Sequence, residues 1–344
     1  MISQDKPMIP THPATLEDLL RCPKSGSRMR WDDGAYVSEG DPTVRFPIEE
    51  GILRAFVPHD GAAGDITERM KAFYEEHPFP NYDEIDNLGS LIEKSRERGF
   101  PEWFNRSIPL NANVLEVGCG TGQLGNFLSI PGRRVVSADL CLNSLRLAQG
   151  FKERNGLQNV HFNQMNLFRL PFQPESFDVV ICTGVLHATD DPAGGFRGFV
   201  PLVKPGGYLI IGLYNLICRL KTVARQYLYP IMGDAVGYLD PYLRKYNPSP
   251  DKRKSWIMDQ YQNPRESLHT MDEVLGWFDE QGVEFVRALP STILGSRFTF
   301  DYRSSLFEPE PRGSRADRLL SQWKEMIFDI DGGLFLMIGR KPEA

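Results

Sequence analysis

A glycine-rich turn between a strand and a helix is the sequence feature that most constrains the fold of this 344-residue chain. Residues 114–117 predict a buried parallel strand, because three of the four are apolar and only Glu116 is charged. Gly118, Gly120 and Gly122 follow at every second position, and the apolar residues after them have helical spacing. Glycine permits a tight turn and lets a ligand approach the backbone without a Cβ in between. The stretch therefore predicts the first unit of a nucleotide-binding α/β fold.

An acidic residue stands at the position expected for ribose recognition. A second predicted strand, residues 135–138, is followed directly by Asp139. This acid lies about 20 residues beyond the glycine turn, which is the spacing expected for a residue that binds the ribose hydroxyls. A dinucleotide-binding turn would have its third glycine at position 123, which is Gln123 here. This spacing disfavours a nicotinamide-dependent oxidoreductase.

The Glu-x-Gly-x-Gly-x-Gly sequence that begins at Glu116 resembles motif I of the class I S-adenosylmethionine-dependent methyltransferases. Strands and helices also alternate from residue 113 in the order of that family. The resemblance covers residues 110–215 as a block and resumes with a helix at 271–281 and a strand at 283–288. It implies an α/β fold with a doubly wound, Rossmann-like sheet. The sheet would be mostly parallel, with an antiparallel last strand at its edge, residues 334–338.

The resemblance also assigns roles to the residues of the turn. Gly118, Gly120 and Gly122 would line the methionine and ribose portions of S-adenosylmethionine, with Glu116 near its ammonium group. Asp139 would accept hydrogen bonds from both ribose hydroxyls. From the residues alone, Glu116 could instead bind the amides of the turn, and Asp139 could instead cap the next helix.

Further residues complete the implied cofactor site. Asn166 stands where the family usually has an acid facing the adenine amino group, and its amide oxygen can still accept that hydrogen bond. Leu167 would offer its backbone amide to the ring. The remaining members of the site are Cys119, Leu140 and Thr183. We expect no metal in this site.

The acceptor side is less visible in the sequence. The run 183–192 resembles the family's loop with Leu-His before Asp-Pro, and its His187 could contact the substrate or act as a base. Many such methyltransferases carry this histidine without using it as a base. Methyl transfer depends mainly on alignment of the reacting atoms in a dry cleft. Tyr214 is a second catalytic candidate, and the predicted substrate residues are Tyr82, His187, Tyr214 and His269.

Residues 1–59 predict a small β-rich module, followed by a Pro/Gly/Ala-rich link. The pattern resembles the zinc-ribbon-like module fused to some methyltransferases, but only Cys22 of the four ligands is present. Ser25 occupies the second ligand position, and the later pair falls on about Glu39 and Pro42. One thiolate cannot complete a tetrahedral zinc site, so we expect the module to be metal-free.

Two further segments would surround the catalytic domain, which spans residues 110–344. Residues 60–109 predict a helical and aromatic cap in which His77–Tyr82 folds over the cofactor or holds the N-terminal module. The insertion 216–270 predicts a helical lid whose apolar face, Leu216, Leu220, Val223 and Leu228, lines the acceptor pocket. A solvated amphipathic helix is the alternative.

Composition limits the partners. A net charge of −6 argues against nucleic acid as the main partner, although a basic patch could overrule it. Five cysteines without paired spacing, no signal-like N-terminus and no membrane-length apolar run predict a cytoplasmic protein. We therefore expect a methyltransferase with a small-molecule acceptor. The open alternatives are methylation of tRNA or a protein, and a non-catalytic module that binds the cofactor or a partner.

Overall fold

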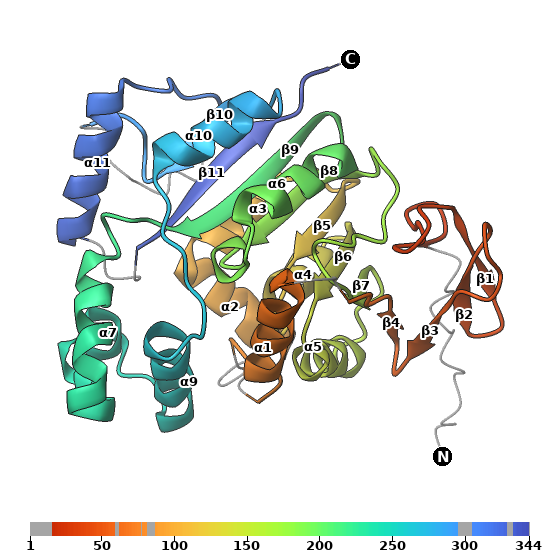
Figure 1. The fold of residues 1–344 in the computed structure, drawn as a ribbon, viewed down its shortest axis with the longest axis horizontal. Coiled ribbons are helices and arrows are strands. Elements are labelled where there is room, and N and C mark those ends of the chain that lie inside the picture. Colours follow the sequence, from red (N-terminus) through yellow and green to blue (C-terminus); the bar gives the residue numbers. More distant parts are fainter. Residues whose placement is uncertain are drawn as a thin grey trace.

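An 11-stranded sheet runs through the protein (Figure 1), in a computed structural model that describes residues 16–58, 62–76, 78–80, 87–294, 305–328 and 333–343. Neighbouring strands from β4 through β9 are parallel, and β11 is antiparallel to both of its neighbours. This arrangement confirms the predicted mixed, mostly parallel α/β sheet. In spatial order the strands are β1 (Met29–Asp32), β2 (Ala35–Ser38), β3 (Arg45–Glu49), β4 (Ile52–Arg54), β7 (Val160–Gln164), β6 (Arg134–Asp139), β5 (Asn113–Val117), β8 (Phe177–Thr183), β9 (Val203–Tyr214), β11 (Leu334–Arg340) and β10 (Glu284–Leu289).

The last strand is antiparallel, as predicted, but its predicted place at the edge is wrong. β11 lies between β9 and β10, and β10 forms the edge. Phe335, Leu336, Met337 and Ile338 are all buried, so both faces of β11 are covered. A continuous apolar run of this kind is typical of a strand inside a sheet.

Helices cover both faces of the sheet, as a doubly wound fold requires. One face packs through residues such as Leu115 against α6 (Pro192–Phe199) and α10 (Met271–Glu280). The other face packs through residues such as Val114 against α2 (Leu88–Arg98), α3 (Phe100–Ser107), α4 (Gln123–Ser129) and α5 (Leu142–Arg154). Adjacent strand residues thus enter different halves of the core, which explains why these strands are apolar throughout.

The strands of the N-terminal module continue the central sheet. β4 pairs in parallel with β7, with Ile52 opposite Phe162. Tyr36 and Leu53 belong to the same core as Leu115. The Pro/Gly-rich link suggested that the module is a separate body, whereas in the structure its strands join the central sheet. The composition of a linker cannot show that strands far apart in the sequence pair with one another.

Hydroxyl groups surround the cysteine of the N-terminal module. Ser38 Oγ lies 2.7 Å from Ser27 Oγ and 3.3 Å from Ser25 Oγ. Burial acts to raise the pKa of the Cys22 thiol, but hydrogen bonds with Ser25 and Ser38 leave it lowered. Within the described residues, no three His, Cys, Asp or Glu side chains are arranged to hold a metal ion. All five cysteines lie in the described residues and are buried, and none of them forms a disulfide.

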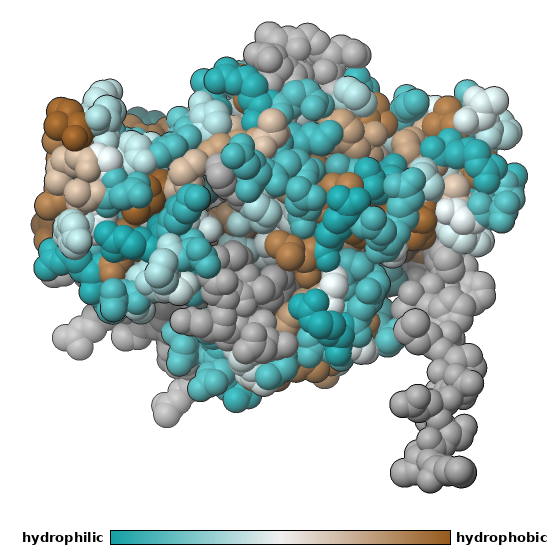
Figure 2. Space-filling model, turned by 90° about the horizontal axis from the view of Figure 1, so that it is seen from below, coloured by the Kyte–Doolittle hydropathy of each residue, from teal (hydrophilic) through white to brown (hydrophobic). Residues whose placement is uncertain are grey.

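The insertion after β9 forms α7 (Leu220–Met232), α8 (Pro241–Tyr246) and α9 (Pro250–Tyr261). α7 and α9 lie side by side (Figure 1). Figure 2 shows hydrophobic residues gathered at the left end of the molecule, on the side where Figure 1 places α7. Leu216, Leu220 and Leu228 are exposed there. None of the helices in the described ranges is long and apolar enough to span a membrane.

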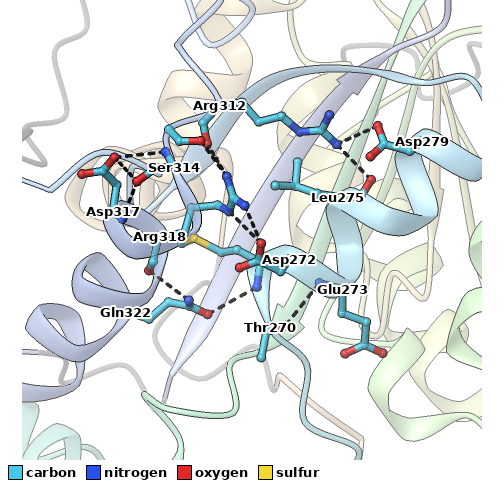
Figure 3. A network of polar contacts seen from close by, with 12 residues as sticks. Thr270, Asp272, Glu273, Leu275, Asp279, Arg312, Ser314, Asp317, Arg318 and Gln322 are labelled. Carbon is cyan, nitrogen blue, oxygen red and sulfur yellow. Dashed lines mark hydrogen bonds and ion pairs between the residues drawn. The ribbon is translucent and has the colours of Figure 1, made fainter.

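A polar network joins the two late helices, α10 and α11 (Arg315–Phe328) (Figure 3). Thr270 caps α10, because its Oγ1 accepts a hydrogen bond from the backbone N of Glu273 at 3.2 Å. The side chain of Glu273 contacts His269 instead of completing a capping box. Arg318 of α11 donates to Asp272 of α10, so the two helices are held together.

Candidate cofactor and acceptor site

The glycine turn has the backbone conformation that the sequence predicts. Gly118, Gly120 and Gly122 have φ values of +72°, +52° and +71°, in the region that L residues rarely adopt. A Cβ on Gly118 would lie 2.1 Å from Val185, and one on Gly120 would lie 2.3 Å from the carbonyl oxygen of Phe79. No side chain fits at either position, so the turn requires glycine.

A cavity of about 480 Å³ opens where β5, β6 and β8 end. Its volume is in the range of small-molecule sites, and the carboxyl edge of a parallel sheet is where such folds bind ligands. Gly122, predicted to line the ligand, is not among the lining residues, because it packs against Ala148 and Phe162. The other predicted cofactor residues all line the cavity: Glu116, Gly118, Cys119, Gly120, Asp139, Leu140, Asn166, Leu167 and Thr183.

Asp139 connects the glycine turn to the start of α5. Its Oδ2 accepts a hydrogen bond from the backbone N of Gly120, and its Oδ1 accepts one from the backbone N of Cys141, each at 2.8 Å. Burial raises the pKa of Asp139, and these amide donors act in the opposite direction. The backbone amide of Leu140 is a third donor to this carboxylate, whose two oxygens together offer about four lone-pair sites. The carboxylate can therefore hold the turn and still accept a hydrogen bond from a hydroxyl group in the cavity.

Glu116 is a buried acid at the end of β5. Its Oε2 accepts a hydrogen bond from Ser137 Oγ at 2.8 Å. Burial raises the pKa of Glu116 to about 7, and the negative charge of Asp139 acts in the same direction. A buried carboxylate without a positive partner is costly. A cationic ligand group beside Glu116 would therefore be stabilising.

Asn166 lines the cavity, but its side chain is engaged by its own loop. Its Oδ1 accepts a hydrogen bond from the backbone N of Phe168 at 3.0 Å, and its Nδ2 donates to the carbonyl of Val57 at 3.3 Å. The amide thus fixes the loop beside β7, and only the second lone pair of Oδ1 remains for a ligand. Met165, Leu140 and Leu167 add apolar walls suited to a flat ring.

His187 and Tyr214 come together at another part of the same cavity. Their ring centroids are 4.2 Å apart. Burial lowers the pKa of His187 to about 3, and the charge of Arg219 acts in the same direction, so the imidazole is neutral. Its Nδ1 has no hydrogen-bond partner in the described part of the chain. Gln260 Nε2 donates to the Tyr214 hydroxyl at 2.9 Å.

Two helices contribute residues that the sequence did not reveal. Tyr74 of α1 (Ala62–Glu76) and Asp259 and Gln260 of α9 line the cavity. The Tyr74 hydroxyl donates to Asp259 Oδ1 at 3.1 Å, and Gln260 Nε2 donates to Asp259 Oδ2 at 2.9 Å. The contact between Tyr74 and Asp259 joins segments 185 residues apart. No local motif signals them.

Three expectations for the acceptor side need correction or fall outside the structure. His269 does not line the cavity, because Ser267 Oγ at 2.8 Å and Glu273 Oε1 at 3.0 Å occupy its ring nitrogens. The apolar stripe that includes Leu220 and Val223 does not line it either, because α7 turns that face away and α9 supplies the wall. Tyr82 and His77 lie outside the described residues, whereas Phe79 and Pro80 line the cavity.

Comparison with known proteins identifies the family. A family model described as "Methyltransferase domain" matches residues 115–211. A protein named ubiquinone biosynthesis O-methyltransferase from Pseudomonas putida is 33% identical over 162 residues, which are 46% of this chain and 67% of that protein. The chain belongs to the class I S-adenosylmethionine-dependent methyltransferase family. The chain spans 46% to 64% of the length of four other curated relatives.

Two further similarities extend beyond the matched block. An uncharacterized protein of Synechococcus sp. is 25% identical over 269 residues, covering 68% of this methyltransferase and 64% of that protein. The structure of PKMT2 from Rickettsia typhi in complex with AdoHcy superimposes with a TM-score of 0.50 at 16% identity. It covers 69% of this chain and 52% of that chain. The structural match supports the fold.

The residues of the cavity fit S-adenosylmethionine, the cofactor of this family. Glu116 is a buried acid that would favour the ammonium group, and the Asp139 carboxylate lines the same cavity, where it would accept a hydrogen bond from the ribose. Gly184 has a φ of +77° and open space where its Cβ would lie, and it lines the cavity. The hydrogen-bonding groups and charges of the methyltransferase site are thus complementary to this cofactor.

The raised pKa of Glu116 predicts a pH-dependent affinity. Burial raises this pKa from 4.5 to about 7, so the folded protein without ligand holds the proton more tightly than the unfolded chain. An ammonium group favours the carboxylate, so affinity for S-adenosylhomocysteine should rise with pH and level off above about 7. Between about pH 8 and about pH 5.5 we expect a loss of about tenfold or more. Calorimetry checks this, and Glu116→Gln should abolish the dependence; an unchanged slope in that variant contradicts the assignment.

Proposed function

We propose that this protein transfers a methyl group from S-adenosylmethionine to a small-molecule acceptor. One observation carries the proposal: a single continuous cavity includes both the cofactor residues Glu116 and Asp139 and the polar side chains of His187 and Tyr214. A donor and an acceptor bound in this cavity would share one enclosed space. Methyl transfer needs this arrangement, because the nucleophile must approach the methyl carbon in line with the carbon–sulfur bond.

Three features favour a small acceptor over a macromolecule. The cavity volume of about 480 Å³ is that of a small-molecule site. α1 and α9 meet across it through Tyr74 and Asp259, which encloses the ligands. The net charge of −6 does not favour nucleic acid. The curated relatives named ubiquinone biosynthesis O-methyltransferases also carry names of small-molecule enzymes.

The protein's own residues supply position and exclusion of water. When bound, S-adenosylmethionine supplies an activated methyl group. Glu116 would hold the ammonium group of its methionine part and Asp139 its ribose, and α1 and α9 cover the cavity. Alignment of this kind can lower a barrier by about 7–11 kcal/mol. Most of the rate enhancement would thus come from positioning.

The sequence suggested His187 as a possible general base, but we assign it a different role. A pKa of about 3 makes its imidazole neutral but a weak base near neutral pH. Its Nδ1, which has no hydrogen-bond partner among the described residues, and the neighbouring Tyr214 hydroxyl can still orient an acceptor hydroxyl by hydrogen bonding. We therefore assign both side chains to acceptor positioning.

A label-transfer experiment tests the proposed acceptor class. The purified protein is incubated with S-adenosylmethionine carrying a labelled methyl group and with separate small-molecule, tRNA and protein fractions of a bacterial extract. We expect label in the small-molecule fraction, and strongly reduced incorporation with Asp139→Ala. Label found only in the tRNA or protein fraction would contradict the proposal and identify that fraction as the acceptor class. Cofactor binding without transfer to any fraction would favour a non-catalytic binding module.

A further inference from the structure

α7 exposes an apolar stripe where a surface helix normally presents polar residues. Tyr227 and Ile231 are 79% and 83% exposed, and Leu220 and Leu228 lie on the same face of the helix. An amphipathic helix normally buries its apolar face in the core of the protein. The apolar stripe of α7 instead faces outward, and no other segment in the described part of the chain covers it.

The stripe continues over the following segments. Tyr238, which is 74% exposed, and Tyr246 extend the apolar surface past the end of α7. We call this region the lid surface, and its exposed members are Leu220, Tyr227, Leu228, Ile231, Met232, Tyr238, Leu239 and Tyr246. Large exposed apolar patches on soluble domains mark contact with a protein or a membrane.

Positive charge surrounds the lid surface. Residues 220–261 contain seven basic and four acidic residues, whereas the whole chain has a net charge of −6. Two of those acids, Asp240 and Asp259, are buried. The exposed side chains of Arg244, Lys245 and Lys254 form no ion pair with any described residue. The exposed part of this segment is therefore more basic than its composition suggests.

The cations lie next to the exposed aromatic rings. The guanidinium of Arg253 lies 5.5 Å from the centroid of Tyr238, and Lys245 Nζ lies 4.8 Å from that of Tyr246. Apolar and tyrosine side chains bordered by Lys and Arg are the composition of a surface that binds the interface of an anionic bilayer. The apolar groups enter the interface while the cations contact lipid phosphates.

We infer that the lid surface docks the protein onto an anionic lipid bilayer. A second copy of the chain is the main competing partner. A symmetric dimer through this patch would place the same basic residues opposite one another, which is unfavourable for like charges. An anionic bilayer complements both the apolar and the basic part of the surface.

Docking through this surface would bring the cavity close to the bilayer. α9 carries Arg253 and Lys254 near its start, and its Trp256 and Gln260 line the cavity. The helix that would face the lipid is therefore also a wall of the ligand site. The inference itself does not depend on which acceptor is methylated.

Vesicle sedimentation with the full chain tests the inference. We expect the protein to sediment with vesicles of phosphatidylcholine and phosphatidylglycerol at low salt, and to be released by high salt. It should bind pure phosphatidylcholine vesicles at least about tenfold more weakly, because each basic residue near an anionic surface adds roughly fivefold. Equal binding to both vesicle types, or binding to neither, overturns the inference.

Matched variants locate the contact. Ile231→Asp, and separately Arg244→Glu with Lys245→Glu, should each weaken vesicle binding by about tenfold or more. Leu110→Asp is the control, because Leu110 is 63% exposed and precedes β5, at the end opposite the cavity. Equal loss in the control would overturn the assignment to the lid surface. A dimer in light scattering that Ile231→Asp dissociates, without vesicle binding, would assign the surface to a second copy instead.

Discussion

Asp139→Ala is expected to weaken S-adenosylhomocysteine binding by about 1.5–3 kcal/mol, which is roughly tenfold to 150-fold in Kd. The carboxylate lines the cavity, and it also holds the backbone N of Gly120 in the turn. Its removal therefore takes away ligand contacts and loosens the loop that forms the site. Calorimetry measures the change directly. Asp18→Ala, which removes an exposed acid paired with Arg134, is the matched control and should bind normally.

A result in which both variants bind equally would show that Asp139 is only a structural cap. Asp139→Asn adds a finer comparison, because the amide keeps one acceptor oxygen but loses the charge. We expect its affinity to lie between those of the native protein and Asp139→Ala. Circular dichroism of each variant separates loss of binding from loss of fold.

Arg219→Met is expected to lower the free energy of unfolding by about 3–5 kcal/mol. The guanidinium is completely buried, pairs with Glu266, donates to Gln260, and stacks 3.6 Å from the Tyr214 ring centroid. The variant leaves the Glu266 carboxylate, whose side chain is only 10% exposed, without its partner. Because Gln260 also contacts Tyr214 and Asp259, methyl transfer should decrease as well. Urea unfolding and turnover measure the two effects.

A second substitution distinguishes the pair from the packing around it. Glu266→Gln in the Arg219→Met background should recover part of the lost stability, because the unpaired charge is removed. Arg146→Ala breaks an exposed ion pair with Glu50 and should leave the urea midpoint unchanged. If the double variant is as unstable as the two single changes added together, the ion pair is not the source of the stability.

The glycine turn and the acid after the second strand could be located from sequence because their signals are local. The glycine turn requires positive φ values at every second position, and only glycine adopts them readily. Asp139 could be placed because a strand of known length precedes it. Gly122 was expected to line the ligand but lies against Ala148 and Phe162, because a turn glycine can serve close packing as well as ligand approach, and the sequence pattern is the same in both cases.

The part of the cavity proposed to bind the methyl acceptor could not be predicted from the sequence, because it is built from segments that are far apart in the chain. Tyr74, Asp259 and Gln260 reach the cavity through helix packing, which no spacing within one segment encodes. The periodicity of α7 correctly indicated a helix with an apolar stripe but could not tell which side faces the protein. His269 was placed near the ligand from its position before a helix, whereas its hydrogen bonds hold that helix start.

The pairing of β4 with β7 has a consequence for the order in which the chain folds. Arg54 Nε donates to Gln164 Oε1 across a separation of 110 residues, so β4 leaves the ribosome long before its partner. Until β7 has been synthesised, the edge of β4 that contains Ile52 and Leu53 has no strand to pair with. An exposed strand edge of this kind can pair with another polypeptide chain and lead to aggregation. Gln164 also donates to the carbonyl of cavity-lining Leu140. The N-terminal strands are thus completed late, by a strand that also contacts the wall of the cavity.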